Sequence, residues 1–247
     1  MNKFNPLETL AKHFTLKVAD TDELKMQEYH FRYHIFCKEF HFEAEEHCHN
    51  QLEKDAYDDN ATHLQIYQND TNAIVGSIRL AQPDNTSSQL LLPFEKYTQA
   101  GFLPSQDPAI KRYAEASRLA VHPDYRRRRY DGQHVTGINT DVAFAQYYPD
   151  RYFPLVAMSM MLGSVALANI LDLDRLYAMM EPKLNQVLAS YGICFNQIGD
   201  LTNYHGERAP FGMDPKQINK TVRPDLAELL QYLHDNLNNA PLEEKRA

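Results

Sequence analysis

The alternation of apolar and polar side chains near the N-terminus predicts a strand followed by a helix. Phe14, Leu16 and Val18 fall on one face of an extended chain, which is the two-residue period of a half-buried strand. The Asp-Thr-Asp-Glu segment that follows has the spacing of a capping box, with Asp20 as the N-cap. We expect the helix to run from there to about Lys38, with an apolar stripe along one side.

Strand patterns dominate the middle of the chain, and helices and strands then alternate. The turn-rich link 69–72 joins two of the strand patterns and predicts a hairpin. The expected elements are strands at 62–68, 73–82 and 109–121, a helix at 150–171, a strand at 175–180, a helix at 182–191, a strand at 193–198 and a last helix near 225–236. This order predicts an α/β sandwich around a mixed sheet.

Composition limits the class of protein. The 247 residues, 43% of them hydrophobic, suffice for one core, so we expect one domain over 1–247 with a C-terminal helical extension at about 223–240. The net charge of −8 argues against a general nucleic-acid binder. Polar residues interrupt the longest apolar run, 154–173, which predicts a buried helix and no membrane span. Three scattered cysteines, with no export signal, predict a cytoplasmic protein.

The densest basic cluster lies in EASRLAVHPDYRRRR, residues 115–129. The strand end VHPDYR (121–126), ahead of a long helix, resembles the acyl-coenzyme-binding segment of the GCN5-related N-acetyltransferase (GNAT) superfamily. The resemblance implies acyl transfer by a GNAT-like αβα sandwich around a mixed, largely antiparallel sheet. Such proteins cradle a pyrophosphate in a glycine-rich loop, whereas residues 127–133 contain the single glycine Gly132, so the expected contact with the nucleotide of coenzyme A is reduced.

A second group of polar residues narrows the resemblance. The patterns E-x-D-x-x-D at 53–58 and E-x-x-R at 115–118 are similar in order and spacing to those of acyl-homoserine lactone synthases. Phe42 stands where those enzymes carry a tryptophan, a residue that this chain lacks. The substrate-binding residues that the resemblance implies are Arg32, Phe36, Asp55, Asp58, Arg79 and Arg118.

Nearly the full length resembles the N-acyl amino acid synthases, and especially the acyltransferase associated with PEP-CTERM and exosortase systems. The segments LLPFEKY, EASRLAVHP and GERAPFGMD carry this likeness. It implies transfer of a long-chain acyl group to the amine of an amino acid or a related small metabolite. The implied donor is the acyl-phosphopantetheine of acyl carrier protein, or acyl-CoA, and no cofactor is bound permanently.

Amide formation from a thioester needs a base that takes a proton from the amine. Glu115, on the strand expected to meet the thioester, is our first choice, and Glu53 is the second. Where this strand parts from its neighbour, a backbone N–H among Leu119, Ala120 and Val121 is expected to polarise the thioester oxygen.

Two interpretations of the arginines remain open. Arg32, Arg79 and Arg118 either bind a substrate carboxylate or hold the acidic residues in place, because a guanidinium pairs bidentately with a carboxylate. For Asp55 and Asp58 a structural role is as well supported as a substrate role, since many carboxylates lie between residues 43 and 59.

The arginine run has its own hypothesis. Arg126, Arg127, Arg128 and Arg129 are expected to dock the acidic surface of acyl carrier protein. Coenzyme A phosphates are the competing ligand, and a solvated basic loop is the structural alternative. We expect no metal at His47-Cys48-His49, because compact zinc sites place their ligands in two spaced pairs.

The sequence thus predicts an N-acyltransferase that uses acyl carrier protein. The alternatives are an acyl-homoserine lactone synthase, a CoA-dependent N-acetyltransferase and a non-catalytic regulator that binds acyl carrier protein. The identity of the acceptor, the acyl chain length, cyclisation of the product and the oligomeric state stay open.

Overall fold

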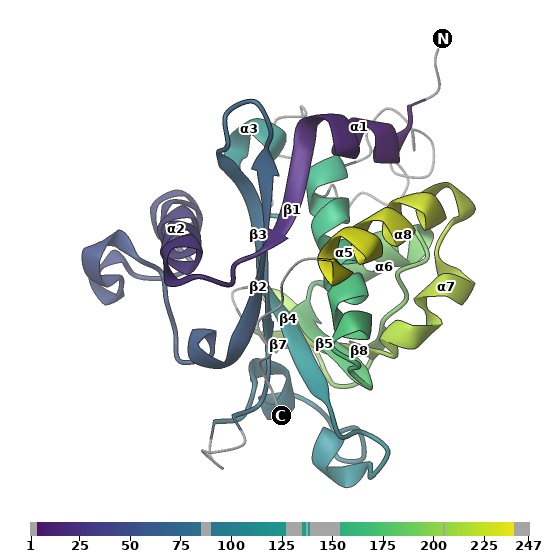
Figure 1. Cartoon of the computed structure of the whole chain (residues 1–247). Helices are drawn as coiled ribbons and strands as arrows, with labels where there is room; N and C mark the ends of the chain where they lie inside the picture. Colours follow the sequence, from purple (N-terminus) through teal and green to yellow (C-terminus); the bar gives the residue numbers. More distant parts are fainter. Residues whose placement is uncertain are drawn as a thin grey trace.

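The computed structural model of the protein describes residues 4–84, 90–126, 135–136, 138, 154–204 and 206–239. Helices cover both faces of a central sheet (Figure 1). The helices are α1 (Pro6–His13), α2 (Asp22–Arg32), α3 (Pro123–Arg126), α5 (Leu155–Ile170), α6 (Pro182–Ser190), α7 (Ile218–Thr221) and α8 (Pro224–Asn238), with a π-helix at Tyr33–Glu39. The strands are β1 (Phe14–Val18), β2 (Ala61–Gln68), β3 (Ile74–Ala81), β4 (Tyr113–Val121), β5 (Arg175–Met180), β6 (Asn196–Gln197), β7 (Thr202–Asn203) and β8 (Glu207–Met213).

The strand order explains where a cavity can form. The order is β1-β2-β3-β4-β5-β8-β6, and β7 also pairs with β8. Every pair is antiparallel except β4 and β5, which are parallel and joined only from Tyr113 to Glu115 on β4. After Glu115 the two strands part. The predicted αβα sandwich around a mixed, largely antiparallel sheet is confirmed.

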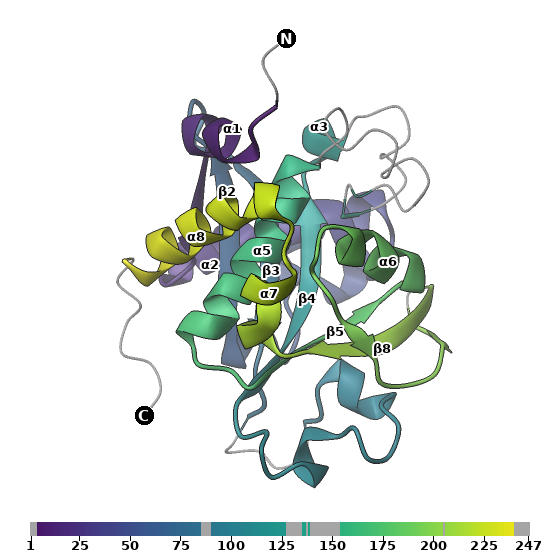
Figure 2. The same ribbon diagram turned by 90° about the vertical axis from the view of Figure 1, so that its right-hand side faces the viewer.

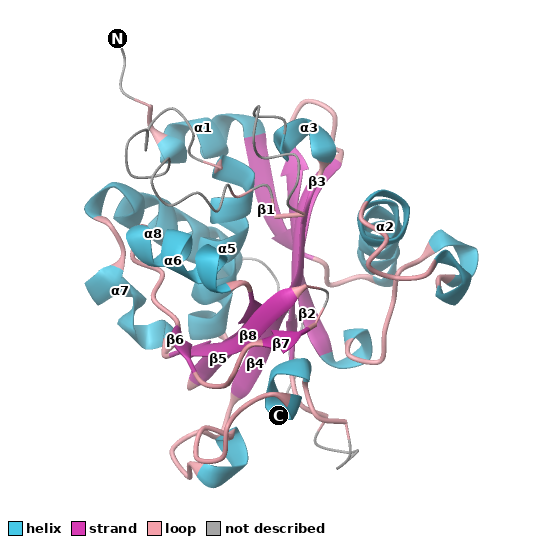
Figure 3. Cartoon of the chain, turned by 180° about the vertical axis from the view of Figure 1, so that it is seen from behind, coloured by secondary structure: helices cyan, strands magenta, loops and turns pink. Residues whose placement is uncertain are grey.

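The two faces of the sheet carry different helices. The helix α2 and the π-helix cover one face, and α1, α5, α6 and α8 cover the other (Figures 1, 2 and 3). The helix α5 is buried along most of its length. It lies close to the sheet at Gly163, where a Cβ atom would stand 2.8 Å from Leu16 and 3.0 Å from Leu64. None of the described helices is long and apolar enough to cross a membrane.

A β-bulge deforms β4 at the residues that matter for the site. Ser117 pairs with Arg79 and Ala120 pairs with Ser77, so Arg118 and Leu119 both stand opposite the single residue between those partners. Arg118 has a φ of 55°, which is uncommon for a residue other than glycine. A bulge of this kind redirects side chains and bends the strand.

Several predicted elements need correction. The N-cap of α2 is Thr21, whose hydroxyl accepts from the Leu24 N–H at 3.3 Å, and Asp20 lies one residue too early. The strand expected at 193–198 shortens to β6. The pattern did not predict β8, because Pro210 interrupts its apolar run and proline is rare inside strands. The start of the helix expected at 150–171 lies partly outside the described residues.

The last helix is part of the packed body. Its buried side chains lie against α5 and α1 rather than apart from the core. The buried residues of α8 are Leu226, Leu229, Leu230, Leu233 and Leu237.

Candidate active site

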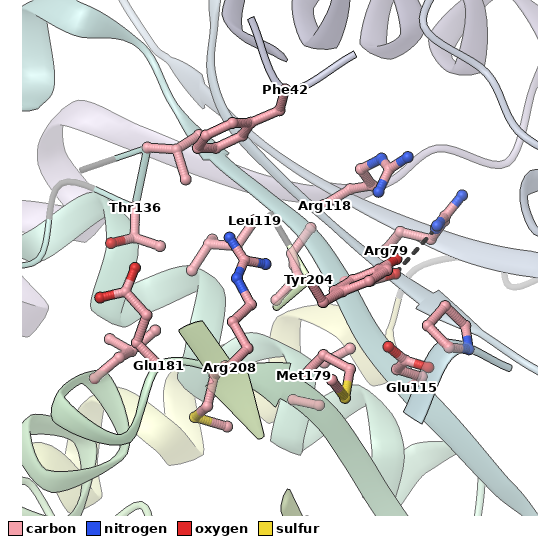
Figure 4. Close-up of a pocket in the computed structure, with 18 of the residues that line it drawn as sticks. Phe42, Arg79, Glu115, Arg118, Leu119, Thr136, Met179, Glu181, Tyr204 and Arg208 are labelled. Carbon is pink, nitrogen blue, oxygen red and sulfur yellow. Dashed lines mark hydrogen bonds between the residues drawn. The ribbon is translucent and has the colours of Figure 1, made fainter. Parts of the chain in front are cut away.

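A cavity of about 150 Å³ lies where β4 and β5 part (Figure 4). Its apolar lining includes Phe36, Phe42, Leu119, Met161, Met179, Met180, Leu184 and Leu188. Its polar lining is Glu43, Arg79, Glu115, Ser117, Arg118, Thr136, Glu181, Tyr204 and Arg208. Charged groups therefore gather at one apolar cavity, an arrangement typical of small-molecule sites.

Glu115 is buried at this cavity and has an altered acidity. Its carboxylate accepts a hydrogen bond of 3.0 Å from the backbone N–H of Phe94. Burial raises the pKa of Glu115 to about 7, although the Phe94 N–H and Arg79 oppose the shift. A carboxylate with a pKa near 7 is half ionised at neutral pH and can accept a proton in a reaction cycle.

The segment LLPFEKY positions that hydrogen bond. It forms a short 3-10 helix, Pro93–Lys96, in which the Glu95 carboxylate accepts from the Leu92 N–H at 2.7 Å. The Phe94 ring stacks on Tyr177 of β5 with 4.0 Å between ring centroids. Phe94 is fully buried, so its N–H is held at a defined point beside Glu115.

Glu53, the second candidate base, has a different environment. One carboxylate oxygen accepts from Arg32 Nε at 2.5 Å, and the other accepts from Arg118 Nε at 3.0 Å. It is buried and is not among the described residues that line the cavity. Glu53 is therefore placed to orient the two arginines.

Arg32 and Arg79 are paired with aspartates in buried ion pairs. Arg32 donates to both oxygens of Asp58, at 2.7 and 3.0 Å, and Arg79 donates to both oxygens of Asp55, at 2.5 and 3.1 Å. Burial alone would raise the pKa of Asp58, but Arg32 and Arg79 hold it well below its usual value. The sequence left two roles open for these arginines, which were to bind a substrate carboxylate or to hold the acidic residues in place. In this geometry Arg32 and Arg79 hold the acidic residues in place.

Arg118 connects these ion pairs to the cavity. The bulge lets its guanidinium reach Glu53, Glu43 at 2.9 Å and Asp55 at 3.1 Å. It also lies over the Phe36 ring, 5.6 Å from the centroid. Arg118 is thus the residue through which the buried ion pairs meet the cavity.

The two phenylalanines of the π-helix region also lie at the cavity. Phe36 and Phe42 both line it, with their ring centroids 6.4 Å apart. Phe42, at the position where the similar enzymes carry tryptophan, therefore still supplies an aromatic wall.

The three backbone donors predicted on β4 differ in position. Leu119 lines the cavity, Ala120 is opposite Ser77 of β3, and the Val121 N–H donates to Val135 O at 3.2 Å. Because N–H groups two residues apart on a strand point the same way, the Leu119 N–H also faces away from β3. Leu119 is thus the donor best placed toward the gap between β4 and β5.

The arginine run is only partly described, and its first member is not at the surface. Arg126 is 1% exposed, donates to Val121 O at 2.6 Å and forms an ion pair with Glu39. Its guanidinium also lies 4.9 Å from the centroid of the Phe40 ring. The expectation that Arg126 docks a carrier protein is corrected, because its charge is neutralised inside the fold. Arg127, Arg128 and Arg129 lie outside the described residues.

Sequence patterns assigned no role to the wall formed by β5, β7 and β8. Glu181, Tyr204 and Arg208 point toward the cavity from this side (Figure 4). The only signal was the segment GERAPFGMD, to which spacing assigned no function. These side chains come together only when β8 pairs with β5.

The described cysteines and histidines do not form a metal site. Within the described ranges, no group of His, Cys, Asp and Glu is arranged to hold a metal ion. Cys37 and Cys48 are free thiols that contact each other, with 2.9 Å between their sulfur atoms.

Comparison with known families identifies part of the chain. Residues 31–133 match the family model described as an acetyltransferase (GNAT) domain. This range includes β2, β3 and β4 and the ion pairs beside the cavity. The prediction that the protein is an acyltransferase is confirmed by this match. No curated protein matches the chain.

Solved structures share the fold at low sequence identity. An N-acyl amino acid synthase from uncultured soil microbes, FeeM, superposes with a TM-score of 0.56 at 14% identity, covering 87% of this chain and 97% of that one. A CoA-dependent acyl-homoserine lactone synthase, BjaI, solved with SAM and isopentyl-CoA, gives 0.57 at 15% identity, covering 90% of each chain. TofI, in a ternary complex with an inhibitor and MTA, gives 0.56 at 16%, covering 86% and 99%.

Proposed function

We propose that the protein is an N-acyltransferase that moves a long-chain acyl group from acyl carrier protein to the amine of an amino acid or a related small metabolite. The observation that carries the proposal is the buried Glu115, with a pKa of about 7, at the cavity where β4 and β5 part. An amine is protonated at neutral pH and must lose a proton before it attacks a thioester, and Glu115 has the acidity for that step.

The reaction follows from the groups at the cavity. Glu115 takes a proton from the ammonium, and the nitrogen lone pair attacks the thioester carbon to form a C–N bond. The Leu119 N–H donates to the oxygen that becomes negative. The C–S bond then breaks, the sulfur leaves as a thiolate that takes up the second proton lost by the attacking nitrogen, and the amide is released.

The apolar lining supports a long acyl chain as the group transferred. Met161 of α5, Met180 of β5, and Leu184 and Leu188 of α6 belong to one core cluster and form one wall, and Met179 lines the cavity from the other face of β5. Methionine is flexible and polarisable, so it adapts to irregular apolar ligands. A short acetyl group would leave this wall unfilled.

The donor is a separate part of the proposal. Acyl carrier protein is favoured because residues 127–133 contain a single glycine and three arginines, and a carrier presents acidic surface and needs no nucleotide pocket. BjaI is described as CoA-dependent, which makes acyl-CoA the competing donor. Values of kcat/KM that are equal for acyl carrier protein and acyl-CoA of one chain length would contradict the preference.

Product analysis tests the proposal. The protein would be incubated with long-chain acyl carrier protein thioester and a pool of the standard amino acids with S-adenosylmethionine, and products would be identified by mass spectrometry. We expect N-acyl amino acids. An acyl-homoserine lactone would favour the alternative synthase, an acetylated product from acetyl-CoA would indicate an N-acetyltransferase, and binding of the carrier without any product would indicate a regulator.

Two wider proposals rest on the sequence. The association with PEP-CTERM and exosortase systems depends on the resemblance of LLPFEKY, EASRLAVHP and GERAPFGMD. The cytoplasm is the compartment that we propose, because the three cysteines are free thiols.

A further inference from the structure

Three of the described arginines line the cavity, and one of them differs from the other two. Arg79 and Arg118 each pair with carboxylates of the chain at 3.1 Å or less. Arg208, on β8, has no recorded ion pair with any carboxylate in the described part of the chain, and its Nε atom is buried without a hydrogen-bond partner. Among the described arginines at the cavity, Arg208 therefore has a buried Nε–H donor that no group of the chain satisfies.

This arrangement is unfavourable unless a ligand completes it. A buried donor without a partner costs about 1–3 kcal/mol, and more when the group is charged. Burial lowers the pKa of Arg208, while Glu181 opposes the shift, and an arginine nevertheless keeps its charge at neutral pH. The guanidinium points into the cavity beside Tyr204 (Figure 4), where a ligand can reach it.

The chemistry of the missing partner follows from the group. A guanidinium presents its donors as a planar fork that fits a carboxylate, with two parallel hydrogen bonds. Glu115 lies on β4 and Arg208 on β8, and β5 runs between those strands. Glu115 pairs with Tyr177 in the sheet, whereas Arg208 lies beside the end of β5. A single acceptor molecule that contacts both side chains must therefore lie diagonally across β5.

We propose that Arg208 is a specificity-determining residue that binds the carboxylate of the acceptor while its amine lies at Glu115. This inference rests on the proposed function, since it takes the same cavity as the acceptor site. Acceptors with a free carboxylate are then selected over the corresponding amides and simple amines. The distance between the amine and the carboxylate of the acceptor should also be selected, because Glu115 and Arg208 are fixed on different strands.

Equilibrium binding tests the inference without requiring turnover. Each of the twenty standard amino acids would be titrated alongside its carboxamide, together with β-alanine and γ-aminobutyrate, into the wild type and Arg208→Met. We expect the best acid to bind the wild type about ten- to a hundredfold more tightly than its amide, as one charge-assisted pair provides. Arg208→Met should remove this difference and leave amide binding unchanged.

Kinetics and a matched control complete the test. In Arg208→Met the acceptor KM should rise by a similar factor with little change in kcat or in the donor KM, and Arg208→Lys should recover part of the loss. Arg223→Met, at a partly buried arginine that is paired with Asp225 and does not line the cavity, should behave as the wild type. Equal binding of acids and amides by the wild type, a difference that survives in Arg208→Met, or a rise confined to the donor KM would overturn the inference. Product formation judges the proposed function separately.

Discussion

The two sides of β4 use the same residue types for opposite purposes. On the side of α2, Arg32 and Asp58 are buried and fully paired. On the side of β5 and β8, Glu115 accepts one backbone hydrogen bond, and Arg208 has an unused buried donor. Charge alone does not distinguish the two regions, whereas the presence of partners within the chain does.

This contrast indicates what each region is for. A charge that is saturated by the protein has little left to offer a ligand, and it shapes the site through the side chains that it holds. A charge that is buried but incompletely satisfied is costly to the fold and is available to substrate. Arg118 stands between them, because it is paired on one side and lines the cavity on the other.

The largest expected effect separates the two glutamates. Glu115→Gln should lower turnover by about 10²–10⁴-fold, because a proton acceptor is lost while the Phe94 N–H keeps an oxygen partner. In the wild type kcat/KM should rise with pH through the Glu115 pKa of about 7, and the variant should lack that inflection. Steady-state kinetics from pH 5 to 9 measure both.

Glu53→Gln is the matched control for that comparison. It should lower the free energy of unfolding, because Arg32 and Arg118 lose a charged partner, but keep the inflection near pH 7. A normal turnover for Glu115→Gln would contradict its assignment as the base. Loss of the inflection in Glu53→Gln instead would assign the base role to Glu53.

The next effect concerns stability. Arg32→Met should lower the free energy of unfolding by about 3–5 kcal/mol, because Glu53 and Asp58 would remain buried without their main cation. Arg208→Met removes a buried donor that lacks such partners and should raise the free energy of unfolding, by about 1–3 kcal/mol. Denaturant unfolding of both variants checks the prediction, and similar losses would erase the distinction between the regions.

A smaller effect appears in the pH dependence of stability. The pKa of Glu115 is raised in the folded protein, so between its ordinary value of 4.5 and about 7 the folded state holds a proton that the unfolded state has released. The contribution of Glu115 to the free energy of unfolding is therefore complete below pH 4.5 and is lost as the pH rises to about 7. Relative to the wild type, Glu115→Gln should gain up to about 3 kcal/mol across this window. A constant difference in unfolding free energy across pH would contradict the altered acidity.

The smallest effect concerns the arginine run. Replacing two of Arg127, Arg128 and Arg129 with glutamate should slow association with acyl carrier protein by roughly tenfold, more at low salt, and leave kcat at saturating donor unchanged. A short pantetheine thioester, which lacks an acidic protein surface, should react as before. Equal losses with both donors would assign these arginines to the active site.

Arg126 supplies the contrasting variant within the same run. Because it is buried against Phe40 and paired with Glu39, Arg126→Glu should reduce stability rather than salt-dependent association. Thermal unfolding and association rates at two salt concentrations would distinguish this result from a docking role.

Local patterns predicted most of the elements, and long-range pairing explains the exceptions. The strand at Arg175–Met180 and the hairpin of β2 and β3 follow from apolar runs bounded by turn residues. The strand β8 was missed because its partner β5 lies some thirty residues earlier, and a proline inside the run masks the strand pattern. The N-cap moved by one residue because aspartate and threonine both cap helices well.

For the site, the sequence specifies which charged residues are present and in what order. Glu115, Arg118 and the acidic residues at 53–58 stand at spacings that indicate acyl transfer through resemblance alone. The tertiary structure determines which of these residues pair with each other and which are candidate reactive groups. This division depends on the bulge at Arg118, on the parting of β4 from β5, and on the pairing of β8 that brings Arg208 to the cavity. Burial and hydrogen bonding set the acidity of a carboxylate, and both depend on residues far away in the chain.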